Sequence, residues 1–282
     1  MKLQVVVAAL GVTAAALLAT SCADMNKPAA AKAPAARVAN TGQGENLDTI
    51  KKLPDWSGVW GPRLFSAPKP GDPPPAPRPG PPQFTPAYAA KFAAYQKQQD
   101  ERKKKGSKYG GGFVTEVANC APYGLPESMN LPYPIEFLFT PGRVTIAIEV
   151  DSIVRRIYTD GRKLPEDPDP MYQGSSVGHW EGDTLVVDTV GINAATDPIV
   201  GIKGHGPDLR INEKMRLITP DILEITTTLT DPEMLTAPYT TISTYERHRD
   251  WAIMEYLCAQ NNRDGVDAKG NPTFNLDRKP GE

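Results

Sequence analysis

Apolar and polar residues alternate along most of the chain from residue 133 to residue 258. In the run 144–150 large apolar side chains occupy every second position, which is typical of a strand with one face in a core. The clearest hairpin spans 175–192, where Gly182 supplies the positive φ of a tight turn. Further runs of this kind cover 137–139, 153–158, 209–218, 222–230, 239–248 and 251–258. Strands joined by short turns predict a mainly β fold, an antiparallel up-and-down meander that closes into a barrel and so removes its edges.

The segment before this meander predicts one more strand and one helix. The run 54–60 indicates a first strand, and the proline-rich stretch 62–84 can neither pair in a sheet nor continue a helix. Thr85 and Pro86 are typical of a helix start, and apolar residues three or four apart follow them, so we expect a helix over 85–105.

The first residues indicate export. Lys2 precedes an apolar run over 5–18 that is short for a membrane-spanning helix, so residues 1–21 are predicted to be a signal peptide. The small residues before Cys22 resemble a bacterial lipobox, and this resemblance implies cleavage before Cys22 and a lipid on its sulfur. Because Ala23 rather than Asp follows, the resemblance favours the periplasmic face of the outer membrane. The alternative is an ordinary secretory signal and a soluble periplasmic or secreted protein.

These predictions divide the chain into four parts. Residues 22–51 are rich in Ala, Pro and Lys and are predicted to be a tether. The barrel domain is expected over 52–262 and a flexible tail over 263–282. In an oxidising compartment Cys120 and Cys258 are expected to form a disulfide. By restricting the unfolded chain, such a disulfide would stabilise the fold by about 4–5 kcal/mol. The alternative is two buried free thiols.

Charged residues at apolar positions of the strands are the main pointer to a site. Arg155 shares a strand face with Ile153 and Ile157, Glu213 with Ile211 and Met215, and Glu255 with Ile253 and Leu257. Asp188 shares a face with Val186 and Val190, although the opposite face of that strand is also apolar. Buried charges are costly unless they are paired. These side chains therefore either line a wet cavity, with Arg155, Asp188 and Tyr158 contacting a ligand, or form an internal ion-pair network.

Two histidines are candidates for acid/base chemistry. His179 lies beside the hairpin turn, and His205 lies in a loop between glycines. Either could act as a base near neutral pH, with Glu213 or Glu255 as the acid or orienting group. Each could equally be a structural histidine, and this is the more ordinary interpretation. No spacing of ligands favours a metal site, and no motif indicates a cofactor.

Two resemblances add to this interpretation. Gly58-Val59-Trp60 resembles the Gly-x-Trp signature of lipocalins, in which the tryptophan closes one end of the barrel beneath an arginine from the last strands. The resemblance implies a lipocalin-like barrel with Arg247 or Arg249 in that place. Separately, RRIYTDGR at 155–162 and SVGHWEGDTLVVDT at 176–189 resemble an exported bacterial family that is known only as uncharacterised.

Three functions fit these observations. The first is a lipid-anchored envelope barrel that binds a small, partly apolar ligand, which could be anionic. The second is a cofactor-independent lyase, isomerase or hydrolase, and the third is a structural envelope protein. The net charge of −2 gives no basic footprint for nucleic acid, so the expected partners are a small molecule and, through Cys22, a membrane.

Overall fold

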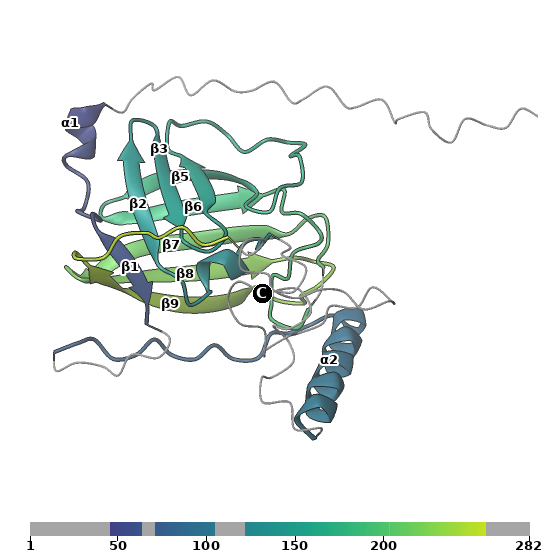
Figure 1. Ribbon diagram of the computed structural model, residues 1–282. Coiled ribbons are helices and arrows are strands. Elements are labelled where there is room, and N and C mark those ends of the chain that lie inside the picture. Colours follow the sequence, from purple (N-terminus) through teal and green to yellow (C-terminus); the bar gives the residue numbers. More distant parts are fainter. Residues whose placement is uncertain (1–45, 64–70, 105–121, 203, 258–282) are drawn as a thin grey trace, which may run out of the picture. The chain divides into compact units, whose positions relative to one another are not determined.

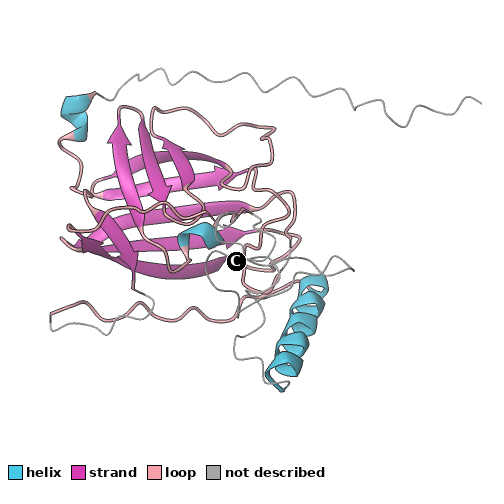
Figure 2. Ribbon diagram, viewed as in Figure 1, coloured by secondary structure: helices cyan, strands magenta, loops and turns pink. Residues whose placement is uncertain are grey.

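The computed structural model describes residues 46–63, 71–104, 122–202 and 204–257, and within them nine strands form one closed barrel (Figures 1 and 2). The strands neighbour one another in chain order, which confirms the predicted barrel. They are β1 (Val59–Pro62), β2 (Ile135–Thr140), β3 (Arg143–Ile148), β4 (Ile153–Tyr158), β5 (Ser175–Glu181), β6 (Thr184–Val190), β7 (Arg210–Thr219), β8 (Ile222–Thr230) and β9 (Tyr239–His248). Cys22, Cys120 and Cys258 lie outside the described residues, so the lipid anchor and the disulfide stay predictions.

One strand pair departs from the expected antiparallel order. β4 and β5 run parallel, with Ile157 opposite Ser176, while the other neighbours are antiparallel. A closed ring of strictly alternating strands needs an even number of them, so a ring with nine strands must contain a parallel pair. The connection 159–174 provides it by carrying the chain back to the end of the barrel where β4 began.

The two ends of the barrel differ in the length of their connections. Short turns at 141–142, 182–183 and 220–221 lie at one end, which we call the turn end. The long connections 191–209 and 231–238 lie at the other, which we call the loop end (right in Figure 1). The short helix η1 (Glu127–Met129) belongs to the segment that packs into the loop end.

The predicted strand over 251–258 is wrong. Within 251–257 the only pairing is a bridge between Tyr256 and Val150, and β9 pairs instead with β8 and β1. A strand has two edges, so once β1 closes the ring against β9 no edge remains for a tenth strand. The alternation in this segment reflects packing on the outside of the barrel, where Trp251 stacks on His248 at 3.5 Å between ring centroids.

Of the helices α1 and α2, α2 was predicted from the pattern and α1 was not. Helix α2 (Pro86–Lys104) matches the predicted helix, although the Thr85 hydroxyl donates to the carbonyl of Glu233. Tyr88 on this helix is buried, and Phe92 packs against Phe84. The short helix α1 (Leu47–Ile50) lies within the predicted tether and is capped by Asn46, whose side chain accepts from two backbone N–H groups.

The turn end is closed as the lipocalin resemblance implies. Trp60 on β1 is fully buried, and the Arg247 guanidinium lies 4.6 Å from the centre of its ring. Gly58 has φ +94°, a backbone conformation that favours glycine, so glycine suits this position of the signature. Strand β1 begins later than predicted, because residues 54–57 do not pair in the sheet; there the Trp56 carbonyl accepts from the Trp60 indole at 3.0 Å.

Arg247 also ties this end of the barrel to the preceding segment. It donates to the Asp55 carboxylate at 3.1 Å and to the Asp55 carbonyl at 2.5 Å. Arg249 forms an exposed pair with Asp221 at 3.2 Å, and the same carboxylate oxygen lies 3.6 Å from the Arg247 Nε. Of the two arginines that the resemblance suggested, Arg247 therefore occupies the place over the tryptophan.

We predict that Arg247→Leu lowers the free energy of unfolding by about 2–4 kcal/mol, because it removes a buried cation–π contact and charged hydrogen bonds. The matched control Arg249→Leu removes an exposed pair and should cost less than about 1 kcal/mol. Urea denaturation of both variants measures the difference. Equal losses would contradict the closing role of Arg247.

Candidate functional site

An ion pair fills the centre of the barrel. The Arg155 guanidinium donates to Glu213 through both terminal nitrogens, with one contact at 3.0 Å, and both side chains have 0% exposed surface. Arg155 also contacts the Thr189 hydroxyl at 3.3 Å, which in turn lies 2.7 Å from the Ser176 hydroxyl. The predicted convergence of Arg155 and Glu213 inside the barrel is confirmed. Because each charge is neutralised by the other, the pair forms part of the packed core.

Glu255 does not join this pair. It is exposed in the segment after β9, so its predicted place inside the barrel is wrong. The inward direction of Glu255 was inferred from alternation within a predicted strand over 251–258. Because that segment does not join the sheet, the inference fails.

Three other predicted residues lie on the outer face. The inward face of β6 carries Leu185, Val187 and Thr189, so Asp188 is exposed and accepts a hydrogen bond from Asn212 at 2.8 Å. The His179 side chain is 60% exposed, and its Nε2 lies 3.2 Å from the Glu181 carboxylate. Tyr158 packs under the Arg162 guanidinium at 3.7 Å, and Asp160 holds that guanidinium in place. These residues are not brought together with Arg155 in one cavity.

His205 ties the long connection 191–209 together. Its Nδ1 lies 2.7 Å from the Gly206 carbonyl oxygen, and its Nε2 lies 3.0 Å from that of Asn193. Both ring nitrogens are therefore engaged by the backbone of the same connection. The acid/base arrangement of His179 or His205 with Glu213 or Glu255 is not assembled, since Glu213 is sealed inside and His179 and Glu255 face solvent.

We predict that Arg155→Met and Glu213→Gln each lower the free energy of unfolding by about 3–5 kcal/mol, because each leaves a buried charge unpaired. The pair Arg216 and Glu224 on the outer face of the barrel, also joined by two N–H contacts, is the control; its side chains are 56% and 18% exposed. Arg216→Met and Glu224→Gln should each cost less than about 1 kcal/mol.

Thermal and urea denaturation of the four variants compare the two pairs. A loss below 1 kcal/mol for the buried pair would mean that the interior is wet rather than packed.

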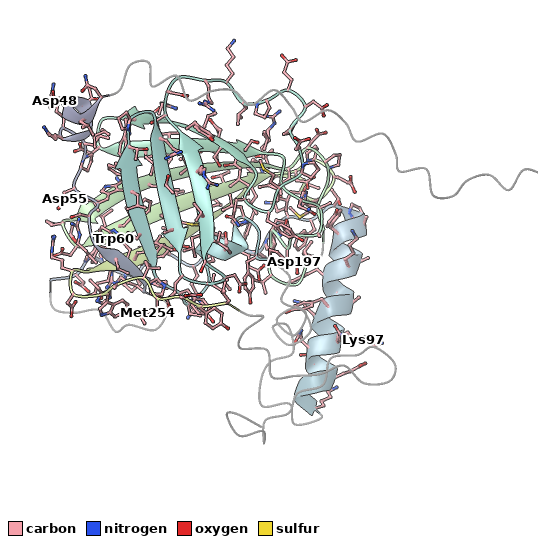
Figure 3. All side chains as sticks on the ribbon, turned by 45° about the horizontal axis from the view of Figure 1, so that its top comes forward. Asp48, Asp55, Trp60, Lys97, Asp197 and Met254 are labelled. Carbon is pink, nitrogen blue, oxygen red and sulfur yellow. The ribbon has the colours of Figure 1, made fainter. Side chains whose placement is uncertain are left out.

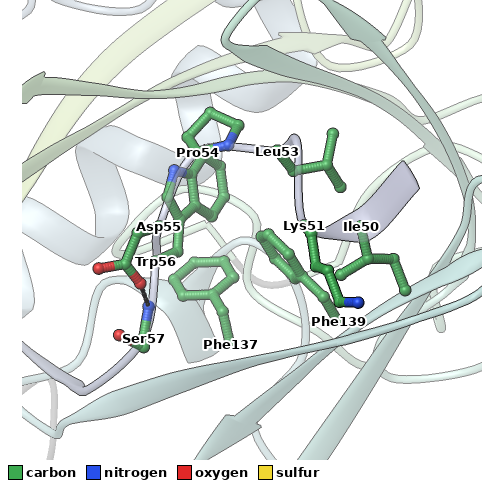
Figure 4. Close-up of a pocket in the computed structure, with 9 residues that line it drawn as sticks. All are labelled: Ile50, Lys51, Leu53, Pro54, Asp55, Trp56, Ser57, Phe137 and Phe139. Atoms are coloured by element: carbon green, nitrogen blue, oxygen red, sulfur yellow. Dashed lines mark hydrogen bonds between the residues drawn. The ribbon is translucent and has the colours of Figure 1, made fainter. Parts of the chain in front are cut away.

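A pocket of about 320 Å³ opens at the turn end (Figure 4). One wall consists of aromatic rings, in which Trp56 lies 4.9 Å from Phe137 and 5.7 Å from Phe139 between ring centroids. The opposite wall comes from α1 and the turn that follows it. The lining residues are Ile50, Lys51, Leu53, Pro54, Asp55, Trp56, Ser57, Phe137 and Phe139.

The two charged groups of this pocket differ in how firmly other side chains hold them. Hydrogen bonds from Ser57 and the charge of Arg247 hold the pKa of Asp55 below its ordinary value, so this carboxylate is ionised and engaged. Lys51 pairs with Asp48 at 3.0 Å, and both side chains are more than 70% exposed. Such an exposed pair contributes little free energy, so Lys51 can exchange Asp48 for a ligand anion at low cost.

Two buried indole groups stand behind the aromatic wall. The Nε1 atoms of Trp56 and Trp180 are buried and have no hydrogen-bond partner among the described residues. The two rings lie 5.4 Å apart, and Trp180 also contacts Phe139 at 5.7 Å. The wall is thus a continuous aromatic cluster that draws on β2, β5 and the segment before β1.

Sequence analysis did not single out this pocket. Phe137 and Phe139 stand two apart and so share a strand face, and Trp56 and Trp60 lie four apart beside a glycine. Aromatic residues placed at one end of two neighbouring strands were the available signal. The distance in sequence between residues 50–57 and 137–139 concealed their meeting in space.

A second polar cluster lies at the loop end. Burial, and then the charge of Asp197, raise the pKa of Glu127 to about 7, while burial raises the pKa of Asp197 to about 6. Burial, with the charge of Glu127 next, also raises the pKa of Tyr123 to about 12. Figure 3 shows Asp197 at the opposite end of the barrel from Asp55 and Trp60.

A scan against models of known protein families and a search of curated proteins found no match to this chain. Among the helices that the structure describes, none is long and apolar enough to cross a membrane. Within the same residues no group of three or more His, Cys, Asp or Glu side chains is placed to hold a metal ion.

Proposed function

We propose that this chain is a binding protein of the cell envelope, and that the turn-end pocket holds a small, partly apolar ligand. The pocket is the main observation that supports this proposal. Its volume of about 320 Å³ lies at the small end of the range typical of ligand sites, about 300–1,000 Å³. Such sites are mostly apolar with a few convergent polar groups, and the aromatic wall with Lys51 and Ser57 at its edge fits that description.

The chemistry of the lining favours a planar ligand with an acidic group. Aromatic rings offer large flat contact areas, and they bind other rings through offset or edge contacts. Lys51 is the cation that lines the pocket, whereas the Asp55 carboxylate is already held by Arg247. A ligand anion beside Lys51 would therefore meet little repulsion.

A pair of matched probes tests this proposal. 1-Anilinonaphthalene-8-sulfonate is anionic, and N-phenyl-1-naphthylamine has the same rings without the charge. We expect Phe139→Ala to weaken the binding of both probes about tenfold, which corresponds to about 1.4 kcal/mol. Lys51→Gln should weaken only the anionic probe, by a factor of about three to ten. Fluorescence titration measures both affinities.

The control is Leu138→Ala, because Leu138 is 46% exposed and points away from the pocket on the same strand as Phe139. This variant should bind both probes like the wild type. If Phe139→Ala and Leu138→Ala have equal effects, the probes bind elsewhere and the pocket is not the site.

The proposal places the protein on a membrane through Cys22. Support comes from the run Leu17-Leu18-Ala19-Thr20-Ser21 before this cysteine, which follows an apolar segment. A lipid there would supply the membrane affinity.

Labelling of cells with a clickable fatty acid should mark the wild type and not Cys22→Ser. Equal labelling of both proteins would rule out lipidation at this position. The result is independent of the probe titrations, which concern the pocket alone.

A further inference from the structure

The proline-rich segment 72–83, which we call the strap, is extended, and Figure 1 draws it as a trace below β9. Every residue from 72 to 82 is either a proline or stands directly before one. Proline fixes its own φ at about −65° and keeps the preceding residue out of the helical region. The backbone of the strap is therefore restricted to the polyproline II conformation along its length.

Burial along the strap repeats with the period of this conformation, which has three residues per turn. Pro73, Ala76 and Pro82 are half-buried and lie three or six residues apart, so they share one edge of the polyproline helix. Pro79 belongs to the same edge but is exposed. The residues on the other two edges are all exposed, namely Pro74, Pro75, Pro77, Arg78, Gly80 and Pro81. One edge of the strap therefore faces the protein, and two edges face solvent.

Both ends of the strap are fixed to the rest of the molecule. At its start the Asp72 carboxylate accepts a hydrogen bond from Arg63 at 2.6 Å, and these side chains are 19% and 7% exposed. At its end the Gln83 carbonyl accepts from the Thr236 N–H at 2.8 Å. Between these points, residues 73–82 form no hydrogen bond or ion pair with any residue that the structure describes. The middle of the strap is thus held in place by its ends alone.

We propose that the strap is a docking segment for a partner protein whose binding groove is lined with aromatic rings. Such grooves bind polyproline II segments, because a segment that is already extended loses little conformational entropy on binding. The exposed pairs 74–75, 77–78 and 80–81 repeat every three residues and would fill successive spaces between the rings. Arg78 is exposed and has no ion pair among the described residues, so we expect a carboxylate beside it in the partner's groove.

A purely structural role explains the fixed ends of the strap but not its exposed edges. A brace would gain stability by burying its apolar rings against the surface that it braces. Five of the seven prolines of the strap are instead exposed. The inference does not depend on the turn-end pocket, because no residue of the strap lines that pocket.

Site-specific photocrosslinking, in the cells that naturally produce the protein, tests this proposal. The photoreactive residue p-benzoylphenylalanine replaces Gly80, where an added Cβ meets nothing within 4 Å. The control places it at Thr230, which is exposed at the end of β8. We expect position 80 to crosslink to one protein at least about tenfold more strongly than position 230. Peptide mapping should locate that crosslink beside aromatic residues of the partner.

Competition and charge reversal test what the partner recognises. A synthetic peptide of residues 72–83 should abolish the crosslink at position 80, whereas the same peptide with Pro74→Ala, Pro75→Ala and Pro77→Ala should not. Arg78→Glu should lower the yield of the crosslink about tenfold, because it places a negative charge beside the expected carboxylate. The matched control is Arg210→Glu at an exposed position of β7, which should leave the yield unchanged.

Three results would overturn the proposal. The first is a yield at position 80 no higher than at position 230, the second is a crosslink that the proline peptide does not displace, and the third is a crosslink to a lipid or polysaccharide. If a variant does not fold, chemical crosslinking of the wild-type protein in the presence of either peptide decides the matter, since only the proline peptide should displace the partner. These experiments do not involve the pocket, so their failure would leave the proposed binding function standing.

Discussion

The buried Arg155–Glu213 pair determines what the barrel can be used for. Two ionised groups with no exposed surface persist in a core only when each neutralises the other, and Thr189 and Ser176 extend the polar contacts around them. The middle of the barrel is therefore occupied by its own side chains. Trp60 under Arg247 closes one end, and the segment 123–131 packs into the other. Under the proposed function, a small ligand therefore binds at an end of this barrel.

The two ends are built differently, and their chemistry follows from that. The turn end has three short connections, and there Phe137 and Phe139 pack as a wall against Trp56. An apolar wall that is already formed suits binding, because little conformational entropy is lost when a ligand enters. The loop end has long connections and carries Glu127 and Asp197, whose pKa values burial raises.

The sequence predicted the barrel and its central pair because both depend on a short-range pattern. Alternation identified the inward faces of β4 and β7, and so it placed Arg155 and Glu213 correctly. It failed for Glu255, since alternation cannot reveal that β1 has already taken the free edge of β9. It left Asp188 undecided because both faces of β6 are apolar. The pocket and the carboxyls of Glu127 and Asp197 were missed because each joins segments far apart in the chain, and their burial arises only on folding.

A crystal structure of the barrel domain with N-phenyl-1-naphthylamine tests the central claim most directly, because it reports the pocket and the interior together. We expect the naphthyl ring between Phe139 and Leu53, against Trp56, with the contact between Arg155 and Glu213 unchanged. The probe inside the barrel, with Arg155 and Glu213 separated, would contradict this account. It would show that the interior is the binding site and that the ion pair is only its resting state.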